Sequence, residues 1–339
     1  MPSVSVIIPT LNRPELLREA IKSVLQQTLP ANEIIIVDDG SLPPVDAAKL
    51  KTEFGSSIKV LRNEESQGLA WARNQGAIAA SSQYVAHLDD DDLFAPKTLA
   101  ECTSLLEADP ALELVFVGVE GFGSDSDYFN KMQPIGLARV IKQGKGREVK
   151  PDLILFSKNL LEGLINQVPM AFQRVVARRE VWERVSKLRL RAYQKVANLP
   201  SEAEAMNLIR GQLRDSEWAL YAGVVCTKTA LYNQPGYLQR CERQGMSSQP
   251  ANLERHTLQA IKIKTQFFRA SLSMQQFKNW KRYIRHSLAK AEFDAAYYYH
   301  HQGKQKQAWI HWWEAIKTRP TLSYVKFGVR LLLAYHALD

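Results

Sequence analysis

The chain has 339 residues, of which 45% are hydrophobic, and a formal net charge of +9. This hydrophobic content supplies a core for one large domain and a smaller one, and it excludes a disordered chain. The three cysteines show no CxxC spacing, which argues against a disulfide framework or a zinc site and favours a reducing compartment. Residues 240–339 contain 17 Lys/Arg and 6 Asp/Glu, so this segment carries +11 and the first 239 residues carry −2.

The two ends of the chain predict no export signal and no membrane span. Met1 is followed within two residues by a strand-like run rather than by a basic and then apolar leader. The apolar run at 329–333 is interrupted by Arg330 and is too short to cross a bilayer. We therefore expect a cytoplasmic protein.

The first hundred residues alternate short apolar runs with helical patterns. The expected strands lie at 4–8, 34–37, 58–61 and 84–88, and the expected helices at 14–27 and 68–80. Strands that are apolar on both faces and separated by helices predict a mostly parallel sheet covered on both sides, hence an α/β fold. In such sheets ligands bind beyond the carboxyl ends of the strands.

Four consecutive aspartates, residues 89–92, follow the strand expected at 84–88. In an extended segment Asp89 and Asp91 share one side while Asp90 points elsewhere. Adjacent carboxylates repel each other unless a cation lies between them, and Mg²⁺ or Mn²⁺ takes oxygen ligands of this kind. The alternative interpretation is an acidic loop tip. Polar residues also end the first two strands, at 9–12 and 38–41, and this convergence at one sheet edge favours the metal site.

Four segments in this order carry a family resemblance: SVIIPTLNR from residue 5, IVDDGS from residue 36, GLAWARN from residue 68 and LDDDD from residue 88. They resemble the family-2 glycosyltransferases, which have the GT-A fold with a Rossmann-like nucleotide-binding sheet. The resemblance is close over about the first 120 residues and loose to about residue 235. A glycosyltransferase domain is thus expected at 1–240 and an α-helical region at 241–339.

The resemblance implies a nucleotide site and a metal site. The first carboxylate of the Asp-x-Asp motif would touch the ribose, and the last would touch the metal on the diphosphate. The implied metal ligands are Asp91 and Asp89. The implied nucleotide-binding residues are Pro9, Thr10, Asn12, Asp39, Arg73, Asp89 and Asp90.

Several of these residues have a structural alternative. Asn12 is also suited to cap the helix that begins near residue 14, and 38–41 is also typical of a plain turn. Arg73 is alternatively a solvated side chain among small helical residues. Asp92 is interpreted as a cap for the following segment, and His87 as a core or cleft-lining histidine with satisfied hydrogen bonds.

The family places a general base in a Glu-Asp pair at the start of a helix, which the segment at 214–220 resembles. Asp215 takes the position of the base, and Arg214 stands where the family has Glu. A neighbouring Arg favours ionised Asp215 and weakens it as a base, so Glu217 is a substitute candidate. The alternative role of Asp215 is to cap the helix.

The resemblance implies an inverting transfer of a sugar from a nucleotide-sugar donor, expected to be a UDP-sugar, with Mn²⁺ or Mg²⁺ as cofactor. The expected acceptor is a hydroxyl of a cell-surface glycan or a lipid-linked precursor. One alternative is a catalytically inactive nucleotide-sugar-binding protein that acts through its helical tail. A nucleotidyltransferase is a second alternative, but it would carry a glycine-rich basic loop after the first strand, and 9–12 is not one.

The remaining segments give weaker signals. Residues 139–150 are basic and glycine-containing and are expected to form an exposed loop. Residues 289–322 match the spacing of one tetratricopeptide-like helical hairpin, which cannot bury its faces alone. The basic region 241–339 predicts peripheral contact with the inner face of a membrane or with a protein, the alternative being a helix with a solvated basic face; nucleic acid is not expected.

Overall fold

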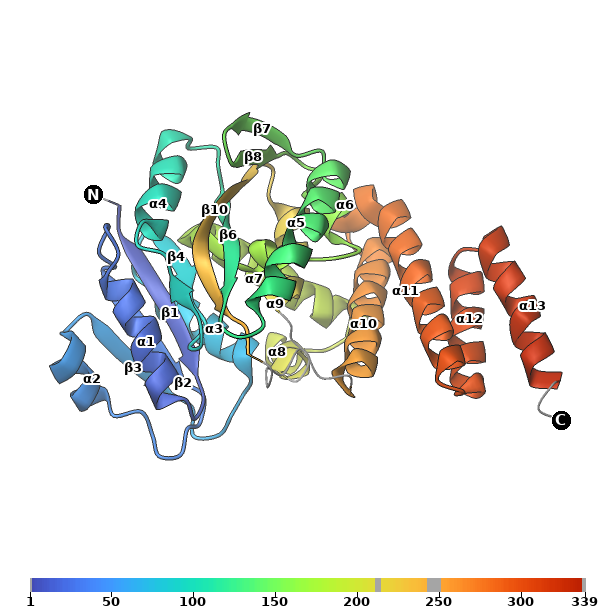
Figure 1. Cartoon of the computed structure of the whole chain (residues 1–339), viewed down its shortest axis with the longest axis horizontal. Coiled ribbons are helices and arrows are strands. Elements are labelled where there is room, and N and C mark those ends of the chain that lie inside the picture. Colours follow the sequence, from blue (N-terminus) through green and yellow to red (C-terminus); the bar gives the residue numbers. More distant parts are fainter. Residues whose placement is uncertain (1, 211–214, 243–250, 337–339) are drawn as a thin grey trace. The chain divides into compact units, whose positions relative to one another are not determined.

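A computed structural model of the chain describes residues 2–210, 215–242 and 251–336 (Figure 1). Its contacts divide the chain into two compact units, residues 1–243 and 244–339, which are described separately.

The first unit is built on one sheet with the strand order β3-β2-β1-β4-β9-β6-β10-β8-β7, and β5 pairs with β10 off this path. The strands are β1 (Val4–Thr10), β2 (Glu33–Asp38), β3 (Ile58–Arg62), β4 (Tyr84–His87), β5 (Leu93–Phe94), β6 (Leu114–Phe122), β7 (Arg147–Lys150), β8 (Leu153–Phe156), β9 (Val175–Arg178) and β10 (Thr229–Arg240). The helices are α1 (Pro14–Leu25), α2 (Ala47–Phe54), α3 (Leu69–Ala79), α4 (Thr98–Ala108), α5 (Ser126–Gln143), α6 (Leu160–Leu164), the 3₁₀ helix η1 (Met170–Gln173), α7 (Arg179–Ala197), α8 (Glu202–Arg210) and α9 (Asp215–Val225).

The first four strands of the sheet, β3, β2, β1 and β4, are parallel, as the alternation of strands and helices predicted. Every residue of β1 and β2 is buried, so both faces of these strands are covered. Val6 and Ile8 of β1 join a core that includes Leu17 of α1, whereas Ile7 points to the opposite face. There α3 packs closely, because a Cβ on Gly76 would lie 2.3 Å from the Ile7 side chain.

Beyond β4 the sheet is mixed. β9 lies between β4 and β6 and is antiparallel to both, while β10 is parallel to β6. Because β9 runs against β4, the residues just before β9 lie next to the end of β4. The antiparallel direction of β9 thus places the residues that precede it at the carboxyl end of β4, where the candidate site lies.

The segment 139–150 is not a loop, contrary to the sequence-based expectation. Its first residues continue α5, and after a short turn β7 pairs with β8 at the sheet edge. The four residues of β7 are all exposed. An exposed, charged edge strand has a polar composition that the sequence alone does not separate from a loop.

The second unit consists of α10 (Ala251–Ser273), the 3₁₀ helix η2 (Gln275–Trp280), α11 (Lys281–His301), α12 (Gln305–Thr318) and α13 (Leu322–His336). Each long helix packs on the one before it. Its main core is formed by Ala295, Ala296, Tyr299, Ala308, Phe327 and Leu331. The expected tetratricopeptide-like hairpin falls on α11 and α12, and its assignment to that repeat family stays a prediction. None of the helices among the described residues combines the length and the apolar character that a membrane crossing needs.

Candidate active site

The loops that follow β1 and β2 are held together by hydrogen bonds at the carboxyl edge of the sheet. Asn12 has a left-handed backbone, with φ of 57°. Its side-chain oxygen accepts a hydrogen bond from the Leu42 N–H at 2.7 Å, and its own N–H donates to Ser41 Oγ at 2.9 Å. Asn12 therefore links two loops and does not cap α1, whose N-cap residue is Arg13.

Asp39, at the end of β2, organises the loop that leads into α3. One carboxylate oxygen accepts hydrogen bonds from Asn63 Nδ2 at 2.7 Å and the Gln67 N–H at 2.9 Å. The other accepts from Ser66 Oγ at 2.7 Å and the Gly68 N–H at 2.8 Å. A carboxylate has about four acceptor positions, so Asp39 is saturated by this loop. A nucleotide contact to Asp39 would have to replace one of these donors.

The acidic turn, residues 89–92, follows β4 at the same edge and receives arginines from several segments. Asp89 forms an ion pair with Arg73 of α3 and a second with Arg174 at 3.0 Å. Burial would raise the pKa of Asp89, but these two cations lower it to about 2. Arg73 is buried, so the alternative of a solvated side chain is wrong. The backbone N–H of Asp89 also donates to the Tyr237 hydroxyl at 3.0 Å.

Asp90 and Asp91 share the guanidinium of Arg13. Arg13 Nη1 lies 3.1 Å from Asp90 Oδ1 and 2.8 Å from Asp91 Oδ2. Asp90 points back to the first strand, where Thr10 Oγ1 donates to its second oxygen at 2.7 Å. Burial raises the pKa of Asp90 to about 6, even though Thr10 and Arg13 lower it. Asp90 thus connects the acidic turn to β1 through Thr10, while its other oxygen shares Arg13 with Asp91.

Asp92 is buried and does not cap the following segment, contrary to the sequence-based interpretation. Its carboxylate accepts from the Arg240 N–H of β10 at 2.8 Å and pairs with Arg174 at 3.4 Å. Burial, with the charges of Asp89 and Asp91, raises its pKa to about 7, although Arg174 lowers it. Because β10 and the residue preceding β9 supply these partners, Asp92 fixes the acidic turn to the second half of the sheet.

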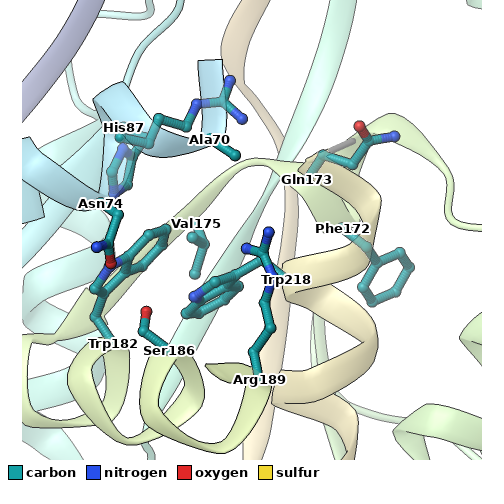
Figure 2. A pocket seen from close by; sticks show the side chains of 11 residues that line it. Ala70, Asn74, His87, Phe172, Gln173, Val175, Trp182, Ser186, Arg189 and Trp218 are labelled. Atoms are coloured by element: carbon teal, nitrogen blue, oxygen red, sulfur yellow. The ribbon is translucent and has the colours of Figure 1, made fainter. Parts of the chain in front are cut away.

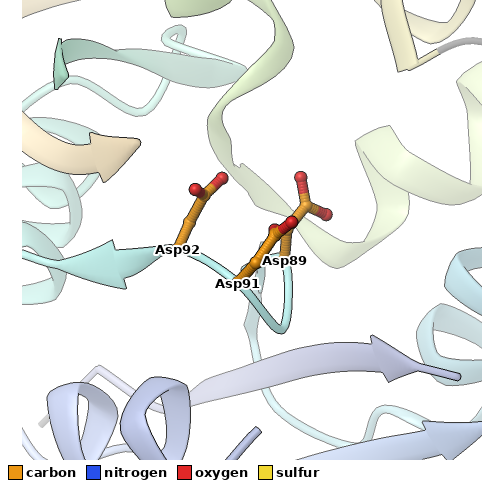
Figure 3. Close-up of side chains that lie close together, drawn as sticks. All are labelled: Asp89, Asp91 and Asp92. Carbon is orange, nitrogen blue, oxygen red and sulfur yellow. The ribbon is translucent and has the colours of Figure 1, made fainter. Parts of the chain in front are cut away.

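Three carboxylates of the acidic turn fit a divalent cation. Oxygens of Asp89, Asp91 and Asp92 all lie within 4.8 Å of one another (Figure 3). Hard ions such as Mg²⁺ and Mn²⁺ take carboxylate oxygens, so the donor set suits them. The sequence predicted Asp89 and Asp91 for this role, and the geometry adds Asp92. A cation bound here would compete with the arginines that face the same oxygens.

A small, partly open cavity lies beside Arg73, the partner of Asp89, and its walls carry three stacked rings. The His87 ring lies 4.1 Å from Trp182, and Trp182 lies 4.3 Å from Trp218, between ring centroids. Figure 2 shows Trp182 and Arg189 of α7 and Trp218 of α9 directed into this space. The cavity volume is about 40 Å³, which admits water but is too small for a sugar ring unless side chains move.

His87 lines this cavity, and neither of its ring nitrogens has a hydrogen-bond partner among the described residues. The expectation of a cleft-lining histidine is thus matched, but that of satisfied hydrogen bonds is wrong. Burial, and then the nearby Arg73, lowers its pKa well below the ordinary value. The indole N–H groups of Trp182 and Trp218 are likewise unpaired within the described part of the chain. The cavity wall therefore offers polar groups to a ligand or to water.

The two candidates for the general base lie at the start of α9. The helix begins at Asp215, whose side chain is outside the described residues, as is the whole of Arg214. Glu217 is fully buried; it accepts a hydrogen bond from Tyr193 Oη at 2.7 Å and lies 3.2 Å from Arg189 Nε. Burial raises the pKa of Glu217, against the opposing effect of Arg189. This enclosure speaks against Glu217 as a substitute base and favours a structural role.

Several site residues were not singled out by the sequence reasoning. Arg13, Arg174, Tyr237 and Arg240 all contact the acidic turn, and none was assigned a role. The only available signal was indirect, because four adjacent carboxylates require nearby cations. Which arginines supply them depends on the fold, since β9 and β10 come late in the chain.

A mostly parallel α/β sheet with an acidic turn at its carboxyl edge has a GT-A-like architecture. The family model described as glycosyl transferase family 2 matches residues 5–174. The chain therefore belongs to glycosyl transferase family 2.

The similar curated proteins described below each match about a third of the chain. An uncharacterised glycosyltransferase of Haemophilus influenzae is 33% identical over 113 residues, which cover 33% of this chain and 37% of that protein. The UDP-Glc:alpha-D-GlcNAc-diphosphoundecaprenol beta-1,3-glucosyltransferase WfgD of Escherichia coli is 37% identical over 105 residues, covering 30% of this chain and 40% of that protein. The chain thus spans well under half the length of these relatives.

Solved structures share the fold at low sequence identity. Staphylococcus aureus TarS 1–349 in complex with UDP-GlcNAc has a TM-score of 0.57 and 17% identity, covering 94% of this chain and 82% of that one. The mannosyltransferase PcManGT from Pyrobaculum calidifontis, in complex with GDP-Man and Mn²⁺, has a TM-score of 0.50 and 17% identity, covering 100% of this chain and 81% of that one. At these identities the likeness shows the GT-A fold.

Proposed function

We propose that this chain transfers a sugar from a nucleotide-sugar donor, a UDP-sugar, to a hydroxyl of a cell-surface glycan or its lipid-linked precursor. The observation that carries the proposal is the cluster of Asp89, Asp91 and Asp92 oxygens within 4.8 Å at the carboxyl edge of the sheet. The loops expected to hold the nucleotide meet at the same edge. The UDP-GlcNAc in the TarS complex and the diphosphoundecaprenol acceptor in the name of WfgD support these kinds of donor and acceptor.

Asp89, Asp91 and Asp92 would hold a Mn²⁺ or Mg²⁺ ion, which when bound neutralises charge on a leaving diphosphate. Thr10, Asn12 and the loop ordered by Asp39 would position the nucleotide. Pro9, buried in β1, shapes the strand end from which this loop departs.

Asp215 is the proposed general base. Its carboxylate takes the proton of the acceptor hydroxyl while the oxygen attacks the anomeric carbon. The bond between that carbon and the diphosphate oxygen breaks on the opposite face, so the configuration inverts and the nucleoside diphosphate leaves.

A second candidate function is a nucleotide-sugar-binding protein without turnover. Two observations favour it: Arg214 replaces the family's Glu in the sequence, and Glu217 is enclosed by Tyr193 and Arg189. The two functions differ in whether Asp215 accepts a proton from the acceptor hydroxyl.

The test combines calorimetry and turnover. UDP and GDP are titrated with and without Mn²⁺ into the wild type, into Asp91→Asn and, as a control, into Asp294→Asn in the second unit. The proposal expects metal-dependent binding that only Asp91→Asn abolishes, and hydrolysis of the matching sugar nucleotide.

Adding candidate acceptors to the wild type and to Asp215→Asn then separates the two functions. Turnover that Asp215→Asn removes without changing nucleotide affinity identifies the transferase. Binding without turnover identifies the binding protein, and no metal-dependent binding overturns both.

A further inference from the structure

The last helix of the second unit, α13, is apolar on two opposite sides. Its buried side holds Tyr324, Phe327 and Leu331, each at most 8% exposed. Tyr324 stacks on Phe293 of α11 and Phe327 packs edge-to-face against it. The Tyr324 carbonyl accepts a hydrogen bond from Trp312 Nε1 of α12 at 2.7 Å. This side is therefore fully used in packing.

The other side of α13 carries an exposed apolar stripe. Leu322, Val325, Val329 and Leu332 are 70%, 48%, 52% and 49% exposed. Their spacing of three, four and three residues places them in one row along the helix. Within the second unit, no residue described by the structure covers this row. Four apolar side chains in one exposed row are more than the scattered single apolar residues of an ordinary surface.

The charges around the stripe distinguish between occupants. Residues 315–336 contain Lys317, Arg319, Lys326 and Arg330 and no acidic residue. Lys326 is exposed and lies next to the stripe on the helix surface. A second copy would bring an equally basic surface against this one, which repulsion disfavours. An apolar row flanked by cations is instead complementary to an anionic lipid surface.

We propose that α13 docks in the plane of an anionic membrane, with Leu322, Val325, Val329 and Leu332 entering the headgroup boundary and the neighbouring basic side chains contacting lipid phosphates. This proposal depends only on the surface of α13, so it would stand even if the chain did not catalyse the proposed reaction. One consequence rests on the proposed function. If the acceptor is lipid-linked, docking would bring the enzyme to the membrane surface that holds this acceptor.

The experiment is sedimentation of the 339-residue chain with vesicles of phosphatidylcholine alone or with about one-third phosphatidylglycerol. We expect binding to the anionic vesicles only, weakened by salt. The double variant Val325→Ser/Val329→Ser should lower the partition coefficient by about tenfold or more, because two half-exposed apolar side chains are lost. The matched control is Ile78→Ser on α3, also an exposed apolar position at 75%, which should bind like the wild type.

Three results would overturn the proposal. The first is no binding to anionic vesicles, and the second is equal binding by the double variant and the wild type. The third is a wild-type dimer in light scattering that becomes a monomer in the double variant, which would assign the stripe to a second copy. Far-ultraviolet circular dichroism of each variant checks that the helices remain folded. Nucleotide titrations of the same samples keep this outcome separate from that of the proposed reaction.

Discussion

Single residues of the acidic turn depend on cations from three separate segments, α3, the loop after β1 and the residue preceding β9. Arg174 is the most buried of these, at 4% exposure, and faces both Asp89 and Asp92. Its guanidinium also lies 4.4 Å from the centre of the Tyr237 ring. Arg174 therefore balances the charges of Asp89 and Asp92, which lie largely away from solvent.

Replacing Arg174 should strongly destabilise the first unit. Arg174→Ala leaves two buried carboxylates without their shared partner, and removal of one member of a buried ion pair costs about 3 kcal/mol or more. Urea unfolding of the wild type and the variant gives this difference. The control is Arg179→Ala, whose half-exposed ion pair with Glu183 is expected to contribute less than about 1 kcal/mol. Equal effects of the two substitutions would contradict the balancing role of Arg174.

Arg13 should compete with a divalent cation for Asp91. Its Nη1 lies 2.8 Å from Asp91 Oδ2, and the Arg13 side chain is 39% exposed. Arg13→Ala removes this competitor, so Mn²⁺ alone should bind more tightly by up to about fivefold, since a partly exposed ion pair contributes up to about 1 kcal/mol. Calorimetric titration of Mn²⁺ measures the change. Arg18→Ala, which breaks a surface pair with Glu53, serves as the control, and unchanged or weaker Mn²⁺ binding by Arg13→Ala would refute the competition.

At the scale of elements, Glu33 at the start of β2 joins neighbouring segments of the sheet. It accepts hydrogen bonds from Ser5 of β1 at 2.6 Å and from the Ser81 N–H before β4 at 2.7 Å, and it pairs with Lys59 of β3. Burial would raise its pKa, but these partners lower it from 4.5 to about 2. The ionised carboxylate is thus stabilised in the folded state.

This shift predicts an acid-dependent loss of stability. Because the folded pKa lies below the unfolded one, the contribution of Glu33 is complete above about pH 4.5 and is lost as the pH falls towards 2. The full shift corresponds to about 3 kcal/mol. In Glu33→Gln the free energy of unfolding should change less over this range than in the wild type. Glu15→Gln, at a side chain that is 83% exposed, should keep the wild-type profile, and parallel curves for all three proteins would disprove the assignment.

The contact between α3 and β1 leaves no room for a side chain at Gly76. A Cβ there would lie 2.3 Å from Ile7 Cγ2, so Gly76→Ala should destabilise the first unit by about 1–3 kcal/mol through overpacking. The double variant Gly76→Ala/Ile7→Ala should lose less than the sum of the two single variants, because the second substitution opens the space. Thermal unfolding of the wild type, the two single variants and the double variant gives the double-mutant cycle. Strictly additive changes in the free energy of unfolding would show that the two residues do not share this contact.

Sequence reasoning could predict the parallel half of this sheet because its signals are local. The runs at β1, β2 and β4 are apolar on both faces, and each is followed by its own polar residues. It could not predict that β9 would enter antiparallel beside β4, because a strand of four residues, three of them buried, carries no sign of its direction. The sequence likewise could not predict that Trp182 stacks on His87, about a hundred residues earlier in the chain, or that Trp218 stacks on Trp182.

At the scale of the whole molecule, the two units have separate hydrophobic cores. A fragment of residues 1–243 should therefore unfold cooperatively and bind nucleotide, whereas a fragment ending at residue 174, where the family match ends, should not fold. The shorter fragment lacks β9, which lies between β4 and β6 in the sheet. It also lacks β10, whose residues Tyr237 and Arg240 contact the acidic turn. Circular dichroism during urea unfolding distinguishes these outcomes, and a cooperative transition in the shorter fragment would contradict them.

The insertion of β9 also determines what can happen while the chain is being synthesised. The strands β1 to β4 leave the ribosome first, but β4 has no native neighbour on its outer side until residues 175–178 have emerged. Throughout this interval the nascent sheet has an unpaired edge, which is a template for wrong pairing. The acidic turn lies at the end of that same edge strand, and its like charges repel an identical neighbouring chain. The four carboxylates can thus oppose wrong pairing between nascent chains at the β4 edge before they bind any ligand.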